Sequence, residues 1–217
     1  MEEIVLIPVK AFEQAKERLA PALSPALRAD LARRLAEAVV EQAAPLPVAV
    51  ACDDPSIAIW ARSLGASVMM NVGSGLNPAV QSAAWDLVAS GAQRVTIVHA
   101  DIPDPSQLSS IGTSAGPERC VIVPDSKNDG TNLISIPASA LRHPLDPTGF
   151  IFKYGPESFQ HHLAEAERLQ LNPRVVRGSP MSFDVDEPHD LDLLGEPFTS
   201  FIPTGPHDPK HQLEPTI

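Results

Sequence analysis

The chain has 217 residues, and 16 Lys and Arg stand against 27 Asp and Glu, so its formal net charge of −11 argues against a broad basic surface for nucleic acid or anionic lipid. Hydrophobic residues make up 43% of the sequence, which excludes general disorder, and no apolar run approaches the roughly 18 residues of a membrane span. We therefore expect a soluble protein with no nucleic-acid or membrane partner, in which local cations hold any anionic ligand.

The first ten residues, MEEIVLIPVK, begin with acids and turn directly into an apolar run. An export signal would show a basic start, a longer apolar stretch and a small-residue cleavage site. We therefore expect a cytoplasmic protein. The length fits one main domain, which we place at residues 1–195.

Apolar runs alternate with helical patterns through the first part of the chain. Ser24-Pro25, Asp54-Pro55 and Asn77-Pro78 each pair a capping residue with a proline and indicate three helix starts. Near-continuous apolar runs are typical of parallel strands that are covered on both faces. We expect these strands over residues 4–9, 47–52, 67–70, 94–100 and 120–124.

The second part of the chain has a different pattern. It predicts a strand over residues 131–136, an irregular proline-bearing excursion over 137–152, a helix over 158–169, a strand over 182–186 and a helical turn over 187–194. Together these elements predict an α/β protein, a three-layer sandwich with a mostly parallel mixed sheet. Ligands of such folds bind outside the carboxyl ends of the strands.

Residues 196–217 contain five prolines and little periodicity, so we expect a proline-rich C-terminal tail. Phe198, Phe201 and Ile202 leave open that this tail docks on a partner subunit. Cys52 and Cys120 both lie in apolar runs, and we expect buried thiols rather than a disulfide or a metal pair.

Lys10, Lys16 and Arg18 follow the first predicted strand within nine residues. Cations at the carboxyl end of that strand are placed to neutralise a triphosphate, although a solvated basic loop would have the same spacing. The sequence contains neither a Walker A motif nor Gly-x-Gly-x-x-Gly, which disfavours P-loop and dinucleotide-binding proteins.

Gly73, Gly75 and Asn77 lead into a predicted helix, where free backbone N–H groups favour an anion or a sugar hydroxyl. Asn77 is expected to cap this helix, either alone or together with a ligand contact.

Asp101 follows a fully apolar strand in the segment HADIP, where a carboxylate is well placed to hold Mg²⁺. Asp184 and Asp186 in FDVDEP share one face of the predicted strand, and either could converge with Asp101. Asp186 could instead cap the following turn, which contains Asp190, and these acids would then be unrelated.

The segments DGTNLI and KYGPES form a further candidate, in which Gly155 and Ser158 could offer backbone N–H and hydroxyl groups to a second phosphate or a carboxylate at a helix N-terminus, with Lys127 and Lys153 nearby in sequence. Ordinary turns and caps would explain the same residues. His161 and His162 are adjacent, so a helix points them about 100° apart and zinc binding is disfavoured. The sequence has no Gly-x-Ser-x-Gly elbow for acyl chemistry.

Taken together, IPVKAFEQAKERLAP, GLNPAV, ADIP, DGTNLI, KYGPESFQHHLAEA and FDVDEPHDL resemble the CofC/FbiD family of guanylyltransferases, in order, over about residues 3–194. Members are similar in fold to the nucleotide-diphospho-sugar-transferase-like group. They transfer GMP from GTP to phosphoenolpyruvate, 2-phospho-L-lactate or 3-phosphoglycerate in coenzyme F-420 biosynthesis, and release pyrophosphate.

The resemblance implies roles for the candidate residues. Lys10, Lys16 and Arg18 would hold the phosphates of GTP, with Lys10, Arg18 and Asp101 as catalytic residues. Gly75 and Asn77 would line the nucleoside side, and Asp101 would bind Mg²⁺ with Asp184 or Asp186. Thr131, Gly155 and Ser158 would hold the phosphorylated acid, whose oxygen attacks the α-phosphorus of GTP without a general base.

Two departures from the family pattern concern the ligands. The N-terminal loop lacks the glycine-rich stretch of sugar-nucleotide enzymes, so the triphosphate depends more on side-chain cations. The segment 137–152 is longer than the family suggests, which leaves the choice of acid open. Partnership with the transferase that consumes the product, and a homodimer, are left open too.

Two other functions compete with this one. A metal-dependent glycosyltransferase that uses a nucleotide sugar shares the architecture but usually carries Asp-x-Asp where this chain has Asp-Ile-Pro. A non-catalytic nucleotide-binding module would keep the glycine loop without needing convergent acids.

Overall fold

The protein is built on one mixed β-sheet. The computed structural model describes residues 3–70, 75–112, 116 and 118–202. In this part of the chain the strands run in the spatial order β3-β2-β1-β4-β6-β5-β7. Their bounds are β1 Glu3–Pro8, β2 Val48–Cys52, β3 Ser67–Met70, β4 Arg94–Val98, β5 Val121–Pro124, β6 Thr131–Pro137 and β7 Arg174–Val175.

Four of the strand pairs are parallel, and β6 runs antiparallel to both of its neighbours. In the centre, Val5 of β1 lies between Val48 of β2 and Thr96 of β4. The predicted mostly parallel mixed sheet is therefore confirmed. The short edge strand β7 was not predicted, because two residues carry too little pattern to be recognised.

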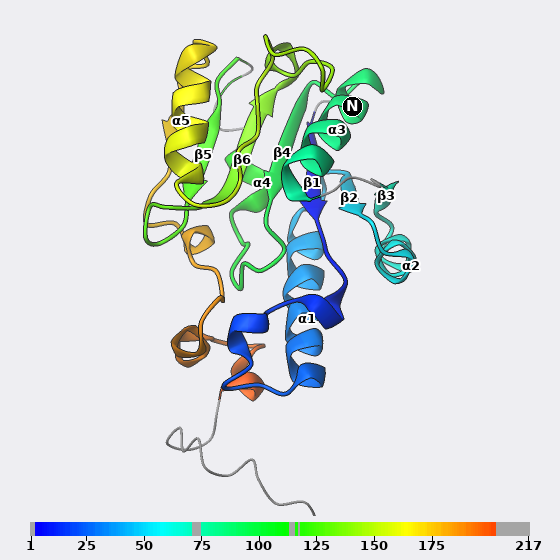
Figure 1. The fold of residues 1–217 in the computed structure, drawn as a ribbon, viewed down its shortest axis with the longest axis vertical. Helices are drawn as coiled ribbons and strands as arrows, with labels where there is room; N and C mark the ends of the chain where they lie inside the picture. The colour runs from blue at the N-terminus through cyan, green and yellow to red at the C-terminus, as the bar shows by residue number, and fades with distance from the viewer. Residues whose placement is uncertain (1–2, 71–74, 113–115, 117, 203–217) are drawn as a thin grey trace, which may run out of the picture.

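Helices cover both faces of the sheet and make it the middle layer of three (Figure 1). One face packs against α1 (Pro25–Gln42), α2 (Pro55–Ser63) and the short α4 (Leu108–Ile111), and the other against α3 (Leu76–Ala89) and α5 (Ser158–Arg168). The starts of α1 and α2 are as predicted: Ser24 Oγ accepts from Leu27 N, and Asp54 Oδ1 accepts from Ser56 N. Each cap satisfies a backbone donor that the first helical turn leaves open. Among the described residues, no helix is long and apolar enough to cross a membrane.

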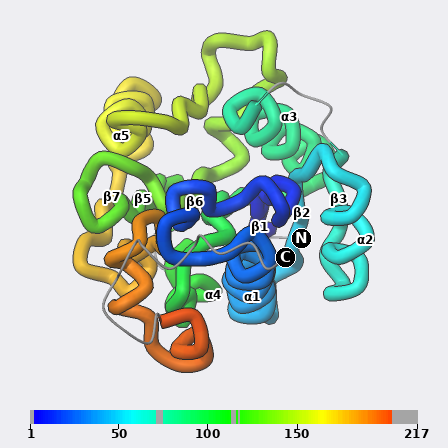
Figure 2. The backbone as a smooth tube through the Cα atoms, turned by 60° about the horizontal axis from the view of Figure 1, so that its bottom comes forward, coloured from blue at the N-terminus to red at the C-terminus, as the bar shows by residue number. Residues whose placement is uncertain are grey.

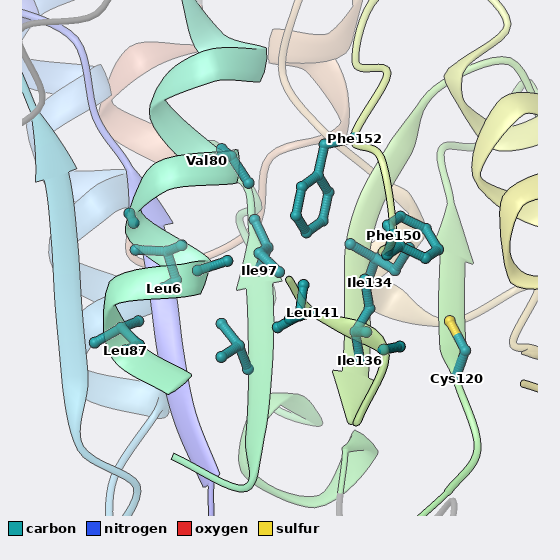
Figure 3. Packing of buried hydrophobic residues seen from close by; sticks show 14 of the residues in the cluster. Leu6, Val80, Leu87, Ile97, Cys120, Ile134, Ile136, Leu141, Phe150 and Phe152 are labelled. Atoms are coloured by element: carbon teal, nitrogen blue, oxygen red, sulfur yellow. The ribbon is translucent and has the colours of Figure 1, made fainter. Parts of the chain in front are cut away.

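The core on the α3 side is formed by strand, helix and loop residues together. Figure 3 shows Leu6 and Ile97 of the sheet facing Val80 of α3, with Phe150 and Phe152 closing the other side. Both phenylalanines belong to the end of the predicted irregular excursion, which begins with the last residue of β6, Pro137, and has the 3-10 helix Ala138–Ala140 as its remaining regular structure. Burying each ring contributes roughly 2–3 kcal/mol, so this segment is held in place although it lacks regular structure. Cys52 and Cys120 are free and buried, as predicted.

The strand predicted at residues 182–186 does not form. Instead, Pro180–Ser182 is a 3-10 helix, residues 183–186 have no regular structure, and the 3-10 helix Pro188–Leu193 follows. The alternating polar and apolar residues do reflect a one-sided burial, because Val185 is fully buried. Its backbone N–H donates to the carbonyl of Asp101 at 3.4 Å, which is a single contact rather than a ladder. A strand needs a continuous partner edge, and this segment has none among the described residues.

The start of the predicted tail packs on the chain itself. Phe198 and Phe201, the latter in the 3-10 helix Thr199–Phe201, are buried against Leu31 and Leu35 of α1. Their rings are thus covered by their own chain and are not available for the docking on a partner subunit that the sequence left open. Residues 203–217 lie outside the described part of the chain.

Candidate functional site

A cavity of about 510 Å³ lies where β1, β2 and β4 end. β1 pairs with β2 on one side and with β4 on the other. From β1 the chain first builds the sheet outward through β2 and β3 and then returns to add β4 on the opposite side, so the strand order reverses at the carboxyl end of β1. The volume is within the range of small-molecule sites. The cavity is lined by Pro8, Val9, Lys10, Phe12, Gln14, Ala15, Lys16, Glu17, Arg18, Ala32, Ala51, Cys52, Asp53, Gly75, Leu76, Ala79, His99, Ala100, Asp101 and Asp186.

The segment after β1 brings a lysine into the acidic part of this cavity. It contains the 3-10 helices Phe12–Gln14 and Glu17–Leu19, with Lys16 between them in a left-handed conformation (φ 56°). Figure 2 shows this segment, in blue, beside the orange segment that carries residues 180–194. Lys16 Nζ lies 2.7 Å from Asp101 Oδ2 and 3.3 Å from Asp186 Oδ1, and its side chain is only 7% exposed.

Asp101, Asp184 and Asp186 form an acidic cluster in which one ligand oxygen from each lies within 4.8 Å of the others. Burial alone would lower the pKa of Lys16, but the charges of Asp101 and Asp186 outweigh it and the pKa is raised. Burial would raise the pKa of Asp101, but Lys16 outweighs it and the pKa is lowered. Burial, followed by the charges of Asp101 and Asp186, raises the pKa of Asp184 to about 6. The cluster therefore holds more negative charge than Lys16 neutralises.

Local bonds explain why both acids of FDVDEP are available. Val185 is anchored in the core between them, and its neighbours Asp184 and Asp186 point the other way. Asp190 Oδ2 accepts from the backbone N–H groups of Asp186 and Glu187 at 2.8 and 2.7 Å. Glu187 is the N-cap of the 3-10 helix Pro188–Leu193, and Asp190 completes its capping box. Asp186 therefore does not cap this helix, and its carboxylate is left to Lys16 and to Arg18 Nη1 at 3.6 Å.

The other two predicted cations are more open than Lys16. The Arg18 side chain is 74% exposed, and Lys10 is exposed on the cavity wall. Among the described residues Lys10 has no ion-pair partner, so its charge is available to a ligand. The structure thus brings Lys10, Lys16 and Arg18 to one cavity.

Only part of the predicted glycine loop can be located, because residues 71–74 lie outside the described part of the chain. Gly75 lines the cavity and is the N-cap of α3 with φ 103°, a conformation that favours glycine. The prediction that Asn77 caps this helix is wrong. Its Nδ2 donates to the Tyr154 carbonyl at 3.0 Å and its Oδ1 accepts from Tyr154 N at 2.6 Å. Asn77 therefore ties the end of the excursion to α3 and does not line the cavity.

Thr131, Gly155 and Ser158 lie outside the cavity lining. Asp129 joins their segments, because its carbonyl accepts from Phe159 N and its Oδ1 accepts from Glu157 N. Thr131 and Ser158 are 1% and 2% exposed, whereas Gly155 is exposed with φ 125°. A ligand can thus approach the Gly155 backbone directly but reaches the two hydroxyl groups only after a local shift.

Three residues near these sites carry contacts that sequence patterns do not reveal. Asn132 Nδ2 donates to the Met181 carbonyl at 3.1 Å and lies 3.5 Å from Asp184 Oδ1, which links β6 to the acidic cluster. His99 lines the cavity, burial lowers its pKa, and its ring lies 5.2 Å from that of Tyr154. The Tyr154 ring in turn lies 4.8 Å from that of His162. The segment HADIP contained one signal, since His99 stands two residues before Asp101.

The acidic cluster fits a hard divalent cation such as Mg²⁺. Its three residues offer only carboxylate oxygens, the ligands that Mg²⁺ prefers. Asp101 Oδ1 is buried and has no hydrogen-bond partner in the described part of the chain, so this oxygen is available to a cation.

Comparison with known proteins gives a consistent result. The family model described as guanylyl transferase CofC like matches residues 3–196. A phosphoenolpyruvate guanylyltransferase of Rubrobacter xylanophilus is 32% identical, over 89% of this chain and 94% of that protein. A 2-phospho-L-lactate guanylyltransferase of Methanobrevibacter smithii is 30% identical, over 86% and 80%. A solved structure from Desulfovibrio desulfuricans G20, described as a nucleotide-diphospho-sugar transferase, aligns with a TM-score of 0.73 at 20% identity over 89% of this chain and 86% of that one.

Proposed function

Because the chain belongs to the family of CofC-like guanylyl transferases and is therefore a nucleotidyltransferase, we propose that it transfers GMP from GTP to a phosphorylated three-carbon acid. One observation carries this proposal. Three cations and two carboxylates of the acidic cluster, Asp101 and Asp186, line a 510 Å³ cavity at the carboxyl ends of β1 and β4, and a ligand oxygen of the third, Asp184, lies within 4.8 Å of theirs. A nucleoside triphosphate with a divalent cation has the charges that such a site complements.

In the proposed reaction, a phosphate oxygen of the acid attacks the α-phosphorus of GTP. A new P–O bond forms, the bond from the α-phosphorus to the bridging oxygen breaks, and pyrophosphate leaves with that oxygen. The attacking phosphate is already anionic near neutral pH, so no side chain has to remove a proton. Positioning and charge neutralisation supply the catalysis.

Each side chain has a part in this proposal. Lys10, Lys16 and Arg18 neutralise the phosphates, with Lys10 and Arg18 the more accessible of the three. Gly75 lies at the nucleoside side of the cavity. Asp101, with Asp184 or Asp186, would hold Mg²⁺, which when bound supplies positive charge to the α-phosphate and the departing pyrophosphate. Asn77 supports this pocket through Tyr154 rather than through direct contact.

Thr131, Gly155 and Ser158 are proposed to hold the acid. The guanylyltransferase relatives named for phosphoenolpyruvate and for 2-phospho-L-lactate make these two acids the first candidates, and 3-phosphoglycerate is the third. We also propose a role in coenzyme F-420 biosynthesis, which the family resemblance supports.

An acceptor panel tests the proposal. The purified chain is given GTP and Mg²⁺ with each of the three acids or with none, and the released pyrophosphate is measured. A transferase that consumes the guanylylated product is added to trap that product. We expect pyrophosphate only when one of the acids is present, and more with GTP than with ATP or CTP. Pyrophosphate release that does not depend on any acid, or no release at all, would contradict the proposal.

A further inference from the structure

His162 is completely buried in α5 and holds two segments that belong to the proposed acid pocket. Its Nε2 lies 2.9 Å from the backbone nitrogen of Lys153, and its Nδ1 lies 3.0 Å from Thr131 Oγ1. Lys153 is two residues before Gly155, so one imidazole ring joins the Thr131 side of the pocket to the Gly155 side. The adjacent His161 is exposed and serves as a comparison.

The partners of the ring decide which nitrogen carries its proton. The Lys153 N–H can only donate, so Nε2 must be the acceptor. Burial lowers the pKa of His162 to about 3, and the ring is therefore neutral near pH 7. A neutral imidazole has a single N–H, which is then on Nδ1 and donates to Thr131 Oγ1.

This bond leaves the proton of the Thr131 hydroxyl free to be donated to another group. A threonine hydroxyl has one proton to donate, and here its oxygen already accepts from His162. Among the described residues, no protein group receives the Thr131 proton. A buried donor without an acceptor is unfavourable, so the binding of an anion that accepts from this hydroxyl would be favoured.

We propose that His162 is a positioning residue that fixes the Thr131 hydroxyl as a hydrogen-bond donor toward the anionic acid, and that also sets the place of the Gly155 backbone through Lys153. The inference rests on the proposed function, because it takes Thr131 as a ligand of the acid. His162 itself contacts neither substrate.

Amide variants separate the two bonds of the ring. In His162→Asn the amide nitrogen stands near the position of Nδ1 and can still donate to Thr131, whereas in His162→Gln the amide stands near Nε2 and keeps only the link to Lys153. We expect His162→Gln to raise the KM for the acid about tenfold, equivalent to about 1.4 kcal/mol, with the KM for GTP changed less than twofold. In His162→Asn, the KM for the acid and the KM for GTP are both expected to stay within about threefold of the values of the unaltered chain.

Two controls distinguish positioning from general structural damage. His161→Gln, one residue away on the exposed side, should leave both KM values unchanged. In a Thr131→Val background, His162→Gln should raise the KM for the acid by less than twofold, since the hydroxyl that it orients is gone. Equal effects of His162→Gln and His162→Asn, or the same fold-change with and without Thr131, would overturn the proposal.

A measurement on the unaltered chain covers the case in which a variant does not fold. The ¹⁵N chemical shifts of the His162 ring report its tautomer directly, and we expect a neutral ring protonated on Nδ1. A ring protonated on Nε2 would overturn the inference whatever the kinetics show. This measurement needs no substrate, so its outcome is independent of the acceptor panel. A failed acceptor panel would contradict the proposed function, whereas a wrong tautomer would contradict only the role of His162.

Discussion

The two ends of β4 both carry charged and polar side chains, but they use them differently. At the amino end, Arg94 and Thr96 form a buried network with Glu3 of β1 and Ser135 of β6, in which Thr96 bonds to Glu3 at 2.6 Å and to Ser135 at 2.7 Å. Among the described residues Glu3 Oε2 has no hydrogen-bond partner, but no cavity opens beside it. All four are at most 6% exposed, and the Gly112 backbone lies so close to Glu3 that a side chain there would clash.

At the carboxyl end, Asp101 faces a cavity instead of a sealed interior. Its carboxylate is only partly satisfied by Lys16, and two more acids stand within ligand distance. The comparison teaches that burial of charge does not by itself mark a functional site. An excess of one charge next to open space does, because the missing partner must then come from a ligand.

The largest effect is expected from a substitution in the acidic cluster at the carboxyl end of β4. Asp101→Asn keeps the shape of the side chain but removes a charge that the divalent cation requires, so we expect kcat to fall about 1000-fold, or about 4 kcal/mol. The melting temperature should change little. Steady-state kinetics and a thermal melt measure both.

Asp104→Asn is the matched control, since this exposed aspartate follows in the same loop and its Oδ1 accepts from Ser106 N. Its kcat should stay within about twofold of the unaltered chain. A kcat for Asp101→Asn within tenfold of the unaltered value would remove Asp101 from the site.

The second prediction breaks the amino-end network. Arg94 donates to Ser135 Oγ and to the carbonyls of Gly116 and Arg119, and its charge faces the buried Glu3. Arg94→Met removes the donor from these acceptors and the cation that faces the buried Glu3 carboxylate, so the free energy of unfolding should fall by about 3 kcal/mol. Urea denaturation measures this loss.

The kinetic result for the same variant sharpens the comparison. Below its melting temperature, Arg94→Met should keep kcat within about twofold, because Arg94 lies at the opposite end of β4 from Asp101. A variant of unchanged stability, or one that stays folded without activity, would show that the two ends are not separated as we describe.

The third prediction concerns Lys16, whose ammonium occupies the oxygens that a divalent cation would take. Lys16→Met should raise the affinity for Mn²⁺ in the absence of nucleotide about tenfold, as expected when about 1.4 kcal/mol of competition is removed. Electron paramagnetic resonance of free Mn²⁺ measures this. Lys10→Met, on the same cavity wall but without a carboxylate partner in the described chain, should leave Mn²⁺ binding unchanged. Equal affinity in Lys16→Met and the unaltered chain would mean that Lys16 does not compete.

The smallest expected effect is a pH dependence of stability at His162. An unfolded histidine binds a proton below its ordinary pKa of 6.5, but the folded ring, with a pKa of about 3, does not. The free energy of unfolding must therefore fall as the pH drops from about 6.5 toward 3, by at most about 1.4 kcal/mol per pH unit. His162→Asn lacks this loss, so its stability relative to the unaltered chain should improve by about 1 kcal/mol between pH 6 and pH 5. Urea titrations at both pH values measure the difference, and a constant difference would contradict the buried neutral ring.

The features that could be predicted from the sequence depend on neighbouring residues. Ser24-Pro25 and Asp54-Pro55 start helices through bonds to residues two or three positions away. The apolar run before Asp101 predicted a buried strand. Because the carboxyl ends of parallel strands lie at the same edge of a sheet, this prediction placed Asp101 near the carboxyl end of β1.

The features that were missed depend on distant partners. Asn77 was expected to cap its own helix, but its amide bonds to Tyr154, 77 residues away. Residues 183–186 alternate as a strand does, yet in the described part of the chain no neighbouring strand offers an edge. His162 became informative only through Thr131 and Lys153, which a helical pattern cannot indicate.

The most direct test of the account is the rate of pyrophosphate release from GTP in the presence of phosphoenolpyruvate, measured with Mg²⁺ and again after the metal is removed with EDTA. We predict rapid release that stops without the metal and returns when Mg²⁺ is restored. Release at the same rate without any divalent cation would contradict the role of Asp101, Asp184 and Asp186, and with it the central claim about this cavity.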